Sequence, residues 1–191
     1  MALEYQRYGR NKNTLVNKTY IESGEYKRKF DNATVNPAVN KALYDCAKKA
    51  LKHRSGTELE DMYWIDGETG SVIYSALDST EARAVEYTEK IKSILRETGD
   101  KKIITLHTHP NSMPPSIEDF NSCFKHGYHS GYVVCHNGKL FRYSANERVS
   151  PSLYKLHIQN FLDDGFDEYN SQIKALEKIK LNYAIKFEEV L

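Results

Sequence analysis

The chain has 191 residues, of which 40% are hydrophobic and 28% are charged, and its net charge at pH 7 is +1. This length and composition suit one domain with a substantial core and exclude a compositionally disordered chain. No apolar run approaches the roughly 18 residues that a membrane-spanning helix needs, so we expect no membrane insertion. The near-neutral charge gives little support to strong phosphate binding, so nucleic acid is not the expected partner.

Basic residues are concentrated in the N-terminal part of the chain. Residues 1–54 hold 12 Lys or Arg against 5 Asp or Glu, a charge of +7, which leaves −6 for the remainder. Tyrosines are scattered among these basic residues, a pattern compatible with a nucleic-acid or partner-binding arm. Because no compact basic block appears, we expect a solvated, tethering arm over residues 1–35. The N-terminus has no apolar stretch behind its charges and does not resemble a secretory signal.

The cysteines are Cys46, Cys123 and Cys135, an odd count without a Cys-x-x-Cys spacing. Neither a disulfide framework nor a cysteine zinc site is indicated, and we expect a reducing, cytoplasmic setting. Cys123 is expected to be a small core residue of a helix. Three other histidines are expected on the surface or behind the residues of a site: His126, His129 and His136.

The first predicted elements are a helix and a hairpin. Asn36 can cap a helix, Pro37 suits its first turn and Gly56 its end, and apolar residues recur between them at helical spacing. Residues 61–76 then predict two short strands around a turn at 66–70.

A second amphipathic helix is predicted over residues 79–99, with Ser79 or Thr80 as its cap. Residues 101–107, KKIITLH, are typical of a short strand rich in β-branched residues. A further helix is predicted to start at Ser116 and to run to about residue 127.

The last predicted elements are a hairpin and two helices. Residues 131–144 predict two strands joined by Asn137-Gly138, a dipeptide typical of a type I′ turn. From Pro151 onward the pattern is helical in two pieces, with a break near Gly165. The whole order indicates an α/β (α+β) fold in which helices flank a mixed β-sheet.

Residues 106–119 read LHTHPNSMPPSIED and combine several possible metal ligands. Side chains alternate along a strand, so His107 and His109 can present both imidazoles to one ion. Pro110 restrains His109 to extended conformations, which helps to hold that shared direction. Asp119, at the start of the next helix, would complete a three-ligand zinc site whose fourth position is open to water. Such a site lowers the pKa of the bound water from about 15.7 to about 7.

The same residues also have a purely structural interpretation. Ser116 followed by Asp119 resembles a helix-capping box, although Glu or Gln is more usual at the third position. His107 and His109 can be ordinary polar residues at the end of a buried strand, which is the more frequent role of an isolated His-x-His. We adopt the metal hypothesis because it explains more of these residues together.

A zinc hydrolase also needs a proton carrier that does not ligate the metal. The candidates are Glu58 and Glu60, in the stretch GTELEDMYWID just before a predicted strand. Because strand side chains alternate with period two, both point to the same side and the pattern does not choose between them. An isolated Glu at a strand start is more often an exposed carboxylate, so either assignment depends on the metal site.

The stretch HTHPNSMPPSIED resembles the JAMM motif, His-x-His-Pro-(x)n-Ser-x-x-Asp, of the JAB/MPN zinc metalloproteases. The resemblance covers roughly residues 36–145 and includes the order of helices and strands. It implies a JAB/MPN-like metalloprotease domain over 36–148, with a basic arm over 1–35 and a C-terminal helical extension over 149–191. More loosely, HRSGTELEDMYWID and HPNSMPPSIEDFNS resemble JAB-like domains encoded with phage head-morphogenesis proteins of Gram-positive bacteria.

Carried over residue by residue, the resemblance implies roles for five positions. His107, His109 and Asp119 match the zinc ligands. Ser116 matches the serine that helps to stabilise the oxyanion. Glu58 matches the general acid/base, because its distance to the following turn is closer to that of the family than the distance of the Glu two residues later. Nine residues separate the second and third ligands, where family members commonly have ten. The two alternatives are that Pro114-Pro115 absorb the difference or that the shorter loop shifts the carboxylate.

The resemblance implies hydrolysis of an amide bond, often beside the C-terminus of a ubiquitin-like protein. The chain lacks an evident long insertion for gripping such a partner, so cleavage of a viral or bacterial protein tail is an equal alternative. A second hypothesis is a catalytically weak or inactive scaffold, for example in phage head assembly, although scaffolds commonly lose the ligand set that this chain retains. A third, a DNA-associated role, has little support from the net charge. The sequence leaves the oligomeric state open.

Overall fold

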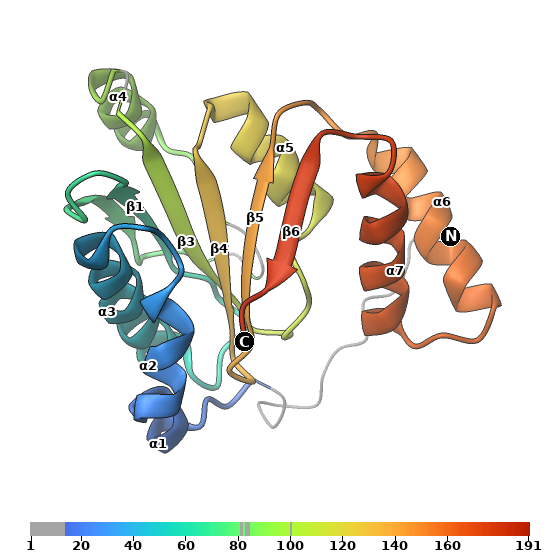
Figure 1. Cartoon of the computed structure of the whole chain (residues 1–191), viewed down its shortest axis with the longest axis horizontal. Helices are drawn as coiled ribbons and strands as arrows, with labels where there is room; N and C mark the ends of the chain where they lie inside the picture. The colour runs from blue at the N-terminus through green and yellow to red at the C-terminus, as the bar shows by residue number, and fades with distance from the viewer. Residues whose placement is uncertain (1–13, 81, 83–84, 100) are drawn as a thin grey trace.

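The structure is a computed structural model of the chain, and it describes residues 14–80, 82, 85–99 and 101–191. Six strands of this part of the chain form one sheet in the order β2-β1-β3-β4-β5-β6 (Figure 1). The strands are β1 (Met62–Asp66), β2 (Val72–Ala76), β3 (Ile103–His109), β4 (Ser130–Cys135), β5 (Leu140–Ala145) and β6 (Ile185–Glu189). β3 and β4 run parallel, and every other neighbouring pair is antiparallel. The expected mixed α/β architecture is therefore confirmed.

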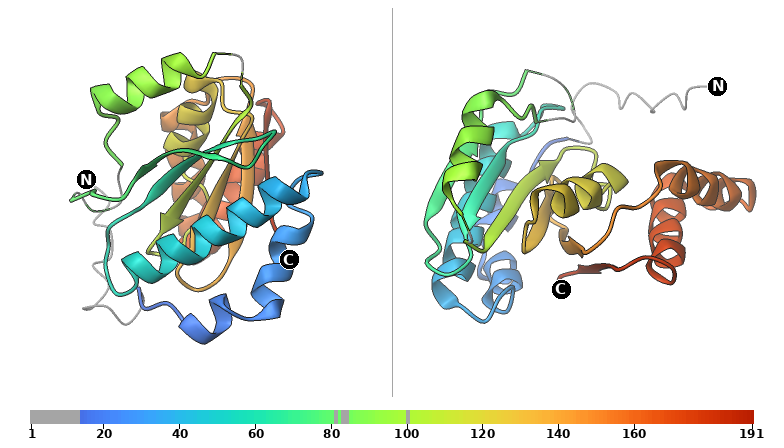
Figure 2. Two further views of the ribbon diagram at one scale, coloured as in Figure 1. Left: turned by 90° about the vertical axis from the view of Figure 1, so that its left-hand side faces the viewer. Right: turned by 90° about the horizontal axis from the view of Figure 1, so that it is seen from above.

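Helices cover both faces of the sheet (Figure 2). They are α1 (Lys18–Ile21), α2 (Gly24–Asp31), α3 (Pro37–Arg54), α4 (Glu89–Glu97), α5 (Ile117–His126), α6 (Pro151–Asp163) and α7 (Glu168–Lys180). The core has two layers: α1, α2 and α3 contribute to one, and α4, α5, α6 and α7 to the other. Strand side chains alternate between the layers, so that Trp64 packs in the second and Ile65 in the first. None of the described helices is both long and apolar enough to cross a membrane.

The first helix and hairpin form as predicted. The Asn36 side chain accepts a hydrogen bond from the Ala38 N–H at the start of α3, and Pro37 occupies the first turn. Between β1 and β2, Asp66 Oδ1 accepts hydrogen bonds from the backbone N–H groups of Glu68 and Thr69, which closes the turn.

The second predicted helix is wrong in its first half. α4 spans only Glu89–Glu97, and its cap is Thr88, whose hydroxyl accepts a hydrogen bond from Ile91 N, rather than Ser79 or Thr80. Ala82 instead forms an antiparallel bridge with Leu59, which requires extended backbone. Tertiary contacts thus override local helix propensity here. Residues 81 and 83–84 of the predicted helix lie outside the described residues, as does residue 100, which lies between this helix and the next predicted strand.

The β4–β5 connection differs from the predicted type I′ turn. Gly138 has φ 88°, but Asn137 does not have the positive φ that this turn requires at both central positions. Cys135 N donates to Lys139 O and Gly138 N donates to Cys135 O, each at 2.9 Å. The loop therefore has three residues, with a type I turn followed by a left-handed glycine.

The C-terminal segment contains the two predicted helices, with the break at Gly165, and also a strand that the sequence analysis missed. β6 pairs antiparallel with β5 and forms an edge of the sheet. Ile185 and Phe187 of β6 are buried, while Lys186 and Glu188 are exposed. The C-terminal extension over residues 149–191 is therefore helical as predicted in two segments but also contains β6, because five residues with a period-two pattern were too short a signal.

The expectation of a solvated arm is also wrong for the described part of the N-terminal segment. α1 and α2 pack on α3, and Ile21, Tyr26 and Phe30 are almost fully buried in the core. Residues 1–13 of the predicted arm lie outside the described residues.

Candidate metal centre

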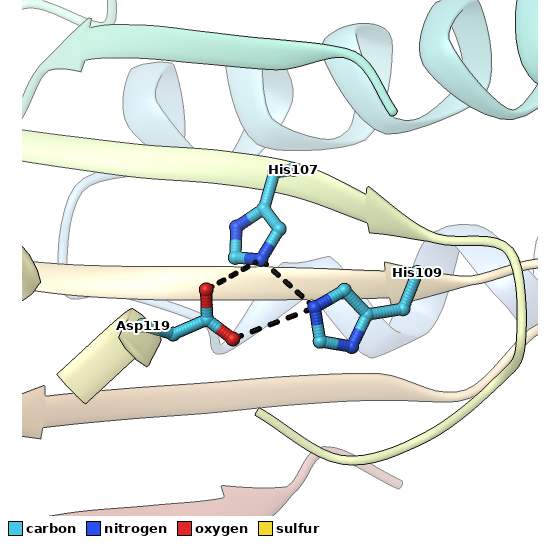
Figure 3. A group of neighbouring side chains, drawn as sticks. All are labelled: His107, His109 and Asp119. Carbon is cyan, nitrogen blue, oxygen red and sulfur yellow. Dashed lines mark hydrogen bonds and ion pairs between the residues drawn. The ribbon is translucent and has the colours of Figure 1, made fainter. Parts of the chain in front are cut away.

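His107, His109 and Asp119 lie together at one end of the sheet (Figure 3). His107 Nε2 is 3.1 Å from His109 Nε2 and 3.2 Å from Asp119 Oδ1. His109 Nε2 is 3.4 Å from Asp119 Oδ2. Both histidines are buried and the carboxylate is half-buried, so the donor atoms converge in a protected position. This group can hold a metal ion.

Strand and helix geometry place these ligands as the sequence predicted. β3 is buried along its whole length, and its period-two alternation directs both imidazoles to one face. Asp119 lies in the first turn of α5, within a capping box. Ser116 Oγ accepts a hydrogen bond from Asp119 N, while Ser116 N and Oγ both donate to Asp119 Oδ2, at 2.7 and 2.9 Å. The capping box is therefore compatible with a metal site, because one Asp119 oxygen faces the helix end and the other faces His107.

The loop between His109 and Asp119 has nine residues and turns sharply after His109. Ser112 adopts a left-handed conformation with φ 58°, and its N–H donates to His109 O. Its hydroxyl accepts a hydrogen bond from Asn137 N, which ties the loop to the β4–β5 turn. Pro114 and Pro115 are buried. The short loop thus delivers the Asp119 carboxylate to both histidines.

A backbone carbonyl fixes the orientation of the second histidine. His109 Nδ1 lies 3.0 Å from Met113 O, an acceptor, so Nδ1 carries the proton of that hydrogen bond. Nε2 of the neutral ring is then left with a lone pair that points at the ligand group, as metal-bound histidines require. The Cys135 thiol donates weakly to the same carbonyl at 3.5 Å.

Aromatic packing supports the first histidine. Its ring lies edge-to-face with Tyr143, at 6.3 Å between ring centroids, and Tyr143 packs in turn against Phe120. His107 Nδ1 is buried and has no hydrogen-bond partner among the described residues. Position and orientation of this ring therefore rest on packing and on its contact with the carboxylate.

The charges of the group are strongly coupled. Burial lowers the pKa of His109, but the hydrogen bond and charge of Asp119 and the charge of Glu60 outweigh it and raise this pKa to about 9. Burial raises the pKa of Asp119, yet the two histidines outweigh it and hold this pKa well below its usual value. In the metal-free protein the carboxylate is thus ionised beside a protonated imidazole, and a metal ion would take the place of that proton.

The two candidate proton carriers lie at different positions. β1 pairs with β3 so that Met62 is opposite His107, and the Thr108 N–H donates to Asp61 O. Glu60, the adjacent residue in the chain, therefore lies near the end of β3 and acts on His109 through its charge. Glu60 is buried, and its charge raises the pKa of His109.

Glu58, the residue selected from the sequence, lies two residues further from the strand. It is half-buried in the connection between α3 and β1. The structure therefore brings the charge of Glu60 close to His109, and Glu58 stays a candidate through the family resemblance. Alternation alone could not show this because it treats both residues alike; the pairing register of β1 with β3 separates them.

The remaining histidines and cysteines lie outside the ligand group. His126 stacks on Tyr87, with ring centroids 4.8 Å apart, and His129 is exposed. His136 is buried at the β4–β5 turn, where its Nδ1 contacts Thr14 O at 2.6 Å. Cys123 is a buried core residue, as expected. All three cysteines are buried and free.

Comparisons of the chain with protein-family models, with curated proteins and with solved structures return no match. Its class is therefore defined by its own fold and site, as a mixed α/β protein with a buried His-His-Asp group that can hold a metal ion.

Proposed function

We propose that the chain is a zinc-dependent peptidase or isopeptidase of the JAMM type. The observation that carries this proposal is the convergence of His107, His109 and Asp119 on one point. It is supported by the capping box, since Ser116 and Asp119 take the positions that the motif assigns to them.

The donor set favours zinc. With one ligand atom from each residue, the three donor atoms all lie within 4.8 Å of one another, so the three side chains face one position. Two imidazoles and one carboxylate also match the three protein ligands of many catalytic zinc sites, which keep a fourth position for water. When bound, the ion would supply a water of pKa about 7 and polarise the scissile carbonyl.

The proton carrier of the proposed reaction is a carboxylate before β1. Glu60 is the stronger candidate because its charge acts on His109, and Glu58 remains the alternative that the family resemblance favours. The carboxylate accepts a proton as water oxygen attacks the carbonyl carbon. It returns that proton to the nitrogen as the carbon–nitrogen bond breaks, so that the products are a carboxylic acid and an amine.

Ser116 has two roles in this proposal. Its hydroxyl donates to Asp119 Oδ2 and so orients that ligand. To stabilise a developing oxyanion, the hydroxyl would rotate away from Asp119 Oδ2. Asp119 Oδ2 would then still accept the hydrogen bond from Ser116 N. The substrate class is an amide bond in a protein, either beside a ubiquitin-like tail or in a phage or bacterial protein.

Zinc-loaded protein incubated with a tryptic peptide mixture and with ubiquitin dimers tests the activity, with mass spectrometry of newly formed amino groups as the readout. We expect Glu60→Gln to lower the rate by about 10²–10⁴-fold, the usual contribution of a general base. Glu58→Gln serves as the matched control and should keep most of the activity. The reverse pattern would assign the role to Glu58, and zinc-loaded protein that cleaves neither probe would favour the inactive scaffold.

A further inference from the structure

A buried charged cluster lies on the sheet face opposite the histidines. The Asp61 carboxylate is fully buried, and its Oδ1 accepts a hydrogen bond from Arg54 Nε at 2.5 Å. His53 Nδ1 lies 2.8 Å from Asp61 Oδ2. Arg54 also donates from Nη2 to Leu77 O at 2.5 Å. The cluster thus joins the end of α3, the start of β1 and the segment that follows β2.

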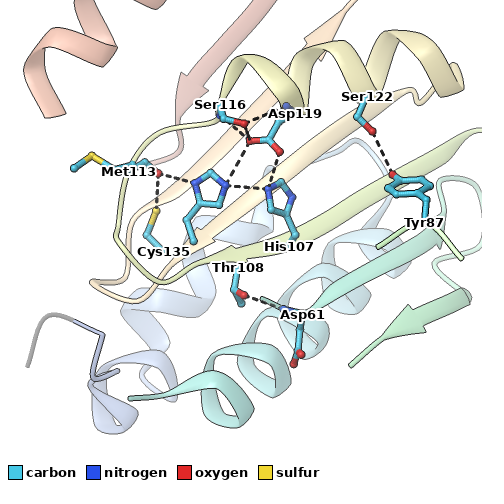
Figure 4. Close-up of polar contacts among 10 residues, drawn as sticks. Asp61, Tyr87, His107, Thr108, Met113, Ser116, Asp119, Ser122 and Cys135 are labelled. Atoms are coloured by element: carbon cyan, nitrogen blue, oxygen red, sulfur yellow. Dashed lines mark hydrogen bonds and ion pairs between the residues drawn. The ribbon is translucent and has the colours of Figure 1, made fainter. Parts of the chain in front are cut away.

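Asp61 is also bonded to the residue between the two histidines (Figure 4). Thr108 is fully buried, and its side chain points away from the ligand face because neighbours alternate along β3. Thr108 Oγ1 accepts a hydrogen bond from Asp61 N, and Thr108 N donates to Asp61 O, each at 3.1 Å. The residue directly before β1 is therefore held at both its N–H and its carbonyl by a single residue of β3.

We propose that Asp61, Arg54 and Thr108 are positioning residues that hold Glu60 near His109. This inference rests on the proposed function, in which Glu60 carries the proton. Glu60 directly precedes Asp61 in the chain, and His109 directly follows Thr108. A displacement of Asp61 along β3 would therefore move the carboxylate of Glu60 away from the ligands by the same amount.

The energetics of the cluster also favour a positioning role. A buried ion pair is often no more stabilising than apolar residues of similar volume, because both charges lose their hydration. What such a pair supplies is a fixed register, since a slip would leave the Asp61 carboxylate buried without its partner. The register matters here because β1 begins only at Met62. Glu60 lies before the strand, so the hydrogen bonds within β1 do not hold it in place.

The first part of the test compares Thr108→Val with Thr108→Ser in the zinc-loaded protein. Valine keeps the volume and loses the hydroxyl, whereas serine keeps the hydroxyl. Because the ligands are unchanged, we expect both variants to bind one zinc per chain. Thr108→Val should lower kcat at least about 10-fold with little change in KM, and should shift the acidic limb of the pH profile, while Thr108→Ser stays near wild type. Thr98→Val, which removes a side-chain hydrogen bond to Leu95 O at the end of α4, is the matched control for loss of a threonine hydroxyl and should also stay near wild type.

The second part uses a readout that does not need activity. The visible spectrum of the cobalt-loaded protein changes with pH when a group beside the metal titrates, and we expect Thr108→Val to move this midpoint in the same direction as Glu60→Gln. Asp61→Asn is the second variant, and it should do the same if Thr108→Val does not fold. Wild-type spectra and kinetics in a folded Thr108→Val or Asp61→Asn protein would overturn the positioning role. Absence of hydrolysis in the wild type, with the midpoint shift still present, would instead overturn the proposed function alone.

Discussion

At the scale of single residues, Asp119 performs two tasks with one carboxylate. Its Oδ2 accepts two hydrogen bonds from Ser116 at the start of α5, and its Oδ1 faces His107. Aspartate suits this arrangement because its short side chain brings the carboxylate back over the helix end, where the helix dipole also favours a negative charge. The choice of Asp over the more usual Glu of a capping box is thus explained by the second task.

Replacing Ser116 with Ala should weaken both the helix and the metal site. Loss of a capping side chain costs about 1 kcal/mol, and loss of a hydrogen bond to a metal ligand commonly lowers metal affinity about 10–100-fold. Ser150→Ala removes the equivalent cap of α6, whose hydroxyl accepts from Leu153 N, and serves as the control. Urea unfolding and competition for zinc with a chromophoric chelator measure the two effects. Equal zinc affinities in the two variants would contradict the role given to Ser116.

The metal-free protein should lose stability as the pH rises from about 6.5 to about 9. His109 keeps its proton up to about pH 9 in the folded protein, whereas in the unfolded chain it titrates near 6.5. The folded state therefore binds more protons in this window, so the free energy of unfolding is largest below it and decreases through it, by on the order of 3 kcal/mol at most.

Urea unfolding of metal-free wild type and His109→Gln at pH 6, 7.5 and 9 checks this sign. The stability difference between the two proteins should shrink as the pH rises. A difference that stays constant or grows across this range would show that His109 is not held protonated by Asp119 and Glu60.

A residue's role could be predicted from the sequence when the residue interacts with others nearby in the chain. His107, His109, Ser116 and Asp119 lie within 13 residues of chain, and strand alternation and helix capping are local rules that relate them. Glu60 depends on the pairing of β1 with β3, a contact between residues about 40 positions apart. Local patterns contain no information on that register, so the sequence favoured Glu58 through family spacing alone.

At the scale of elements, the pairing of β4 with β5 positions a tyrosine ring against the candidate metal centre. Gly131 of β4 lies opposite Tyr143 of β5, and the tyrosine ring covers the glycine. A Cβ on Gly131 would lie 2.1 Å from Tyr143 Cζ, far inside any real contact. The absence of a side chain at this position is thus what lets Tyr143 reach the ring of His107.

Gly131→Ala should therefore destabilise the protein and disturb the site. We expect a loss of about 2–3 kcal/mol from overpacking, together with weaker zinc binding as Tyr143 is displaced toward His107. Gly24→Ala is the control, because its Cβ would meet only the flexible end of Arg28 at 3.6 Å and alanine favours the helix. Thermal unfolding compares the two, and a Gly131→Ala protein as stable as Gly24→Ala would contradict this packing.

The elements that the sequence missed or misplaced share a physical cause. β6 has five residues, and α4 loses its predicted first half where Ala82 pairs with Leu59. In both segments a partner strand distant in the chain decides the backbone conformation. Elements with strong local signals, such as α3 with Asn36 and Pro37 at its start, were predicted correctly.

At the scale of the whole molecule, the sheet separates two layers of helices. The candidate site lies on the side of α5, and α1, α2 and α3 pack on the opposite face. The layer of α1, α2 and α3 contains the largest apolar side chains of the N-terminal segment, including Tyr26 and Phe30. The charged cluster of Arg54 and Asp61 lies at the end of the same layer. The described part of the N-terminal segment, residues 14–35, is thus part of this core layer rather than a separate arm.

Truncation of Phe30 should show that this segment belongs to the cooperative core. Phe30 is 1% exposed and packs edge-to-face on Tyr26 and Tyr44. Phe30→Ala should cost about 3–5 kcal/mol of unfolding free energy. Val35→Ala, at a fully exposed position nearby, should change stability by less than about 0.5 kcal/mol. Similar small effects in urea unfolding of both variants would mean that the segment is not part of the core.

The central claim is that His107, His109 and Asp119 form one zinc site. Its most direct test is metal analysis of the wild type, His107→Ala, Asp119→Ala and Glu60→Gln after equilibration with zinc and removal of excess metal. The account predicts close to one zinc per chain in the wild type and in Glu60→Gln, and loss of zinc in the two ligand variants. A wild-type protein that takes up no zinc, or a His107→Ala protein that keeps a full equivalent, would contradict it.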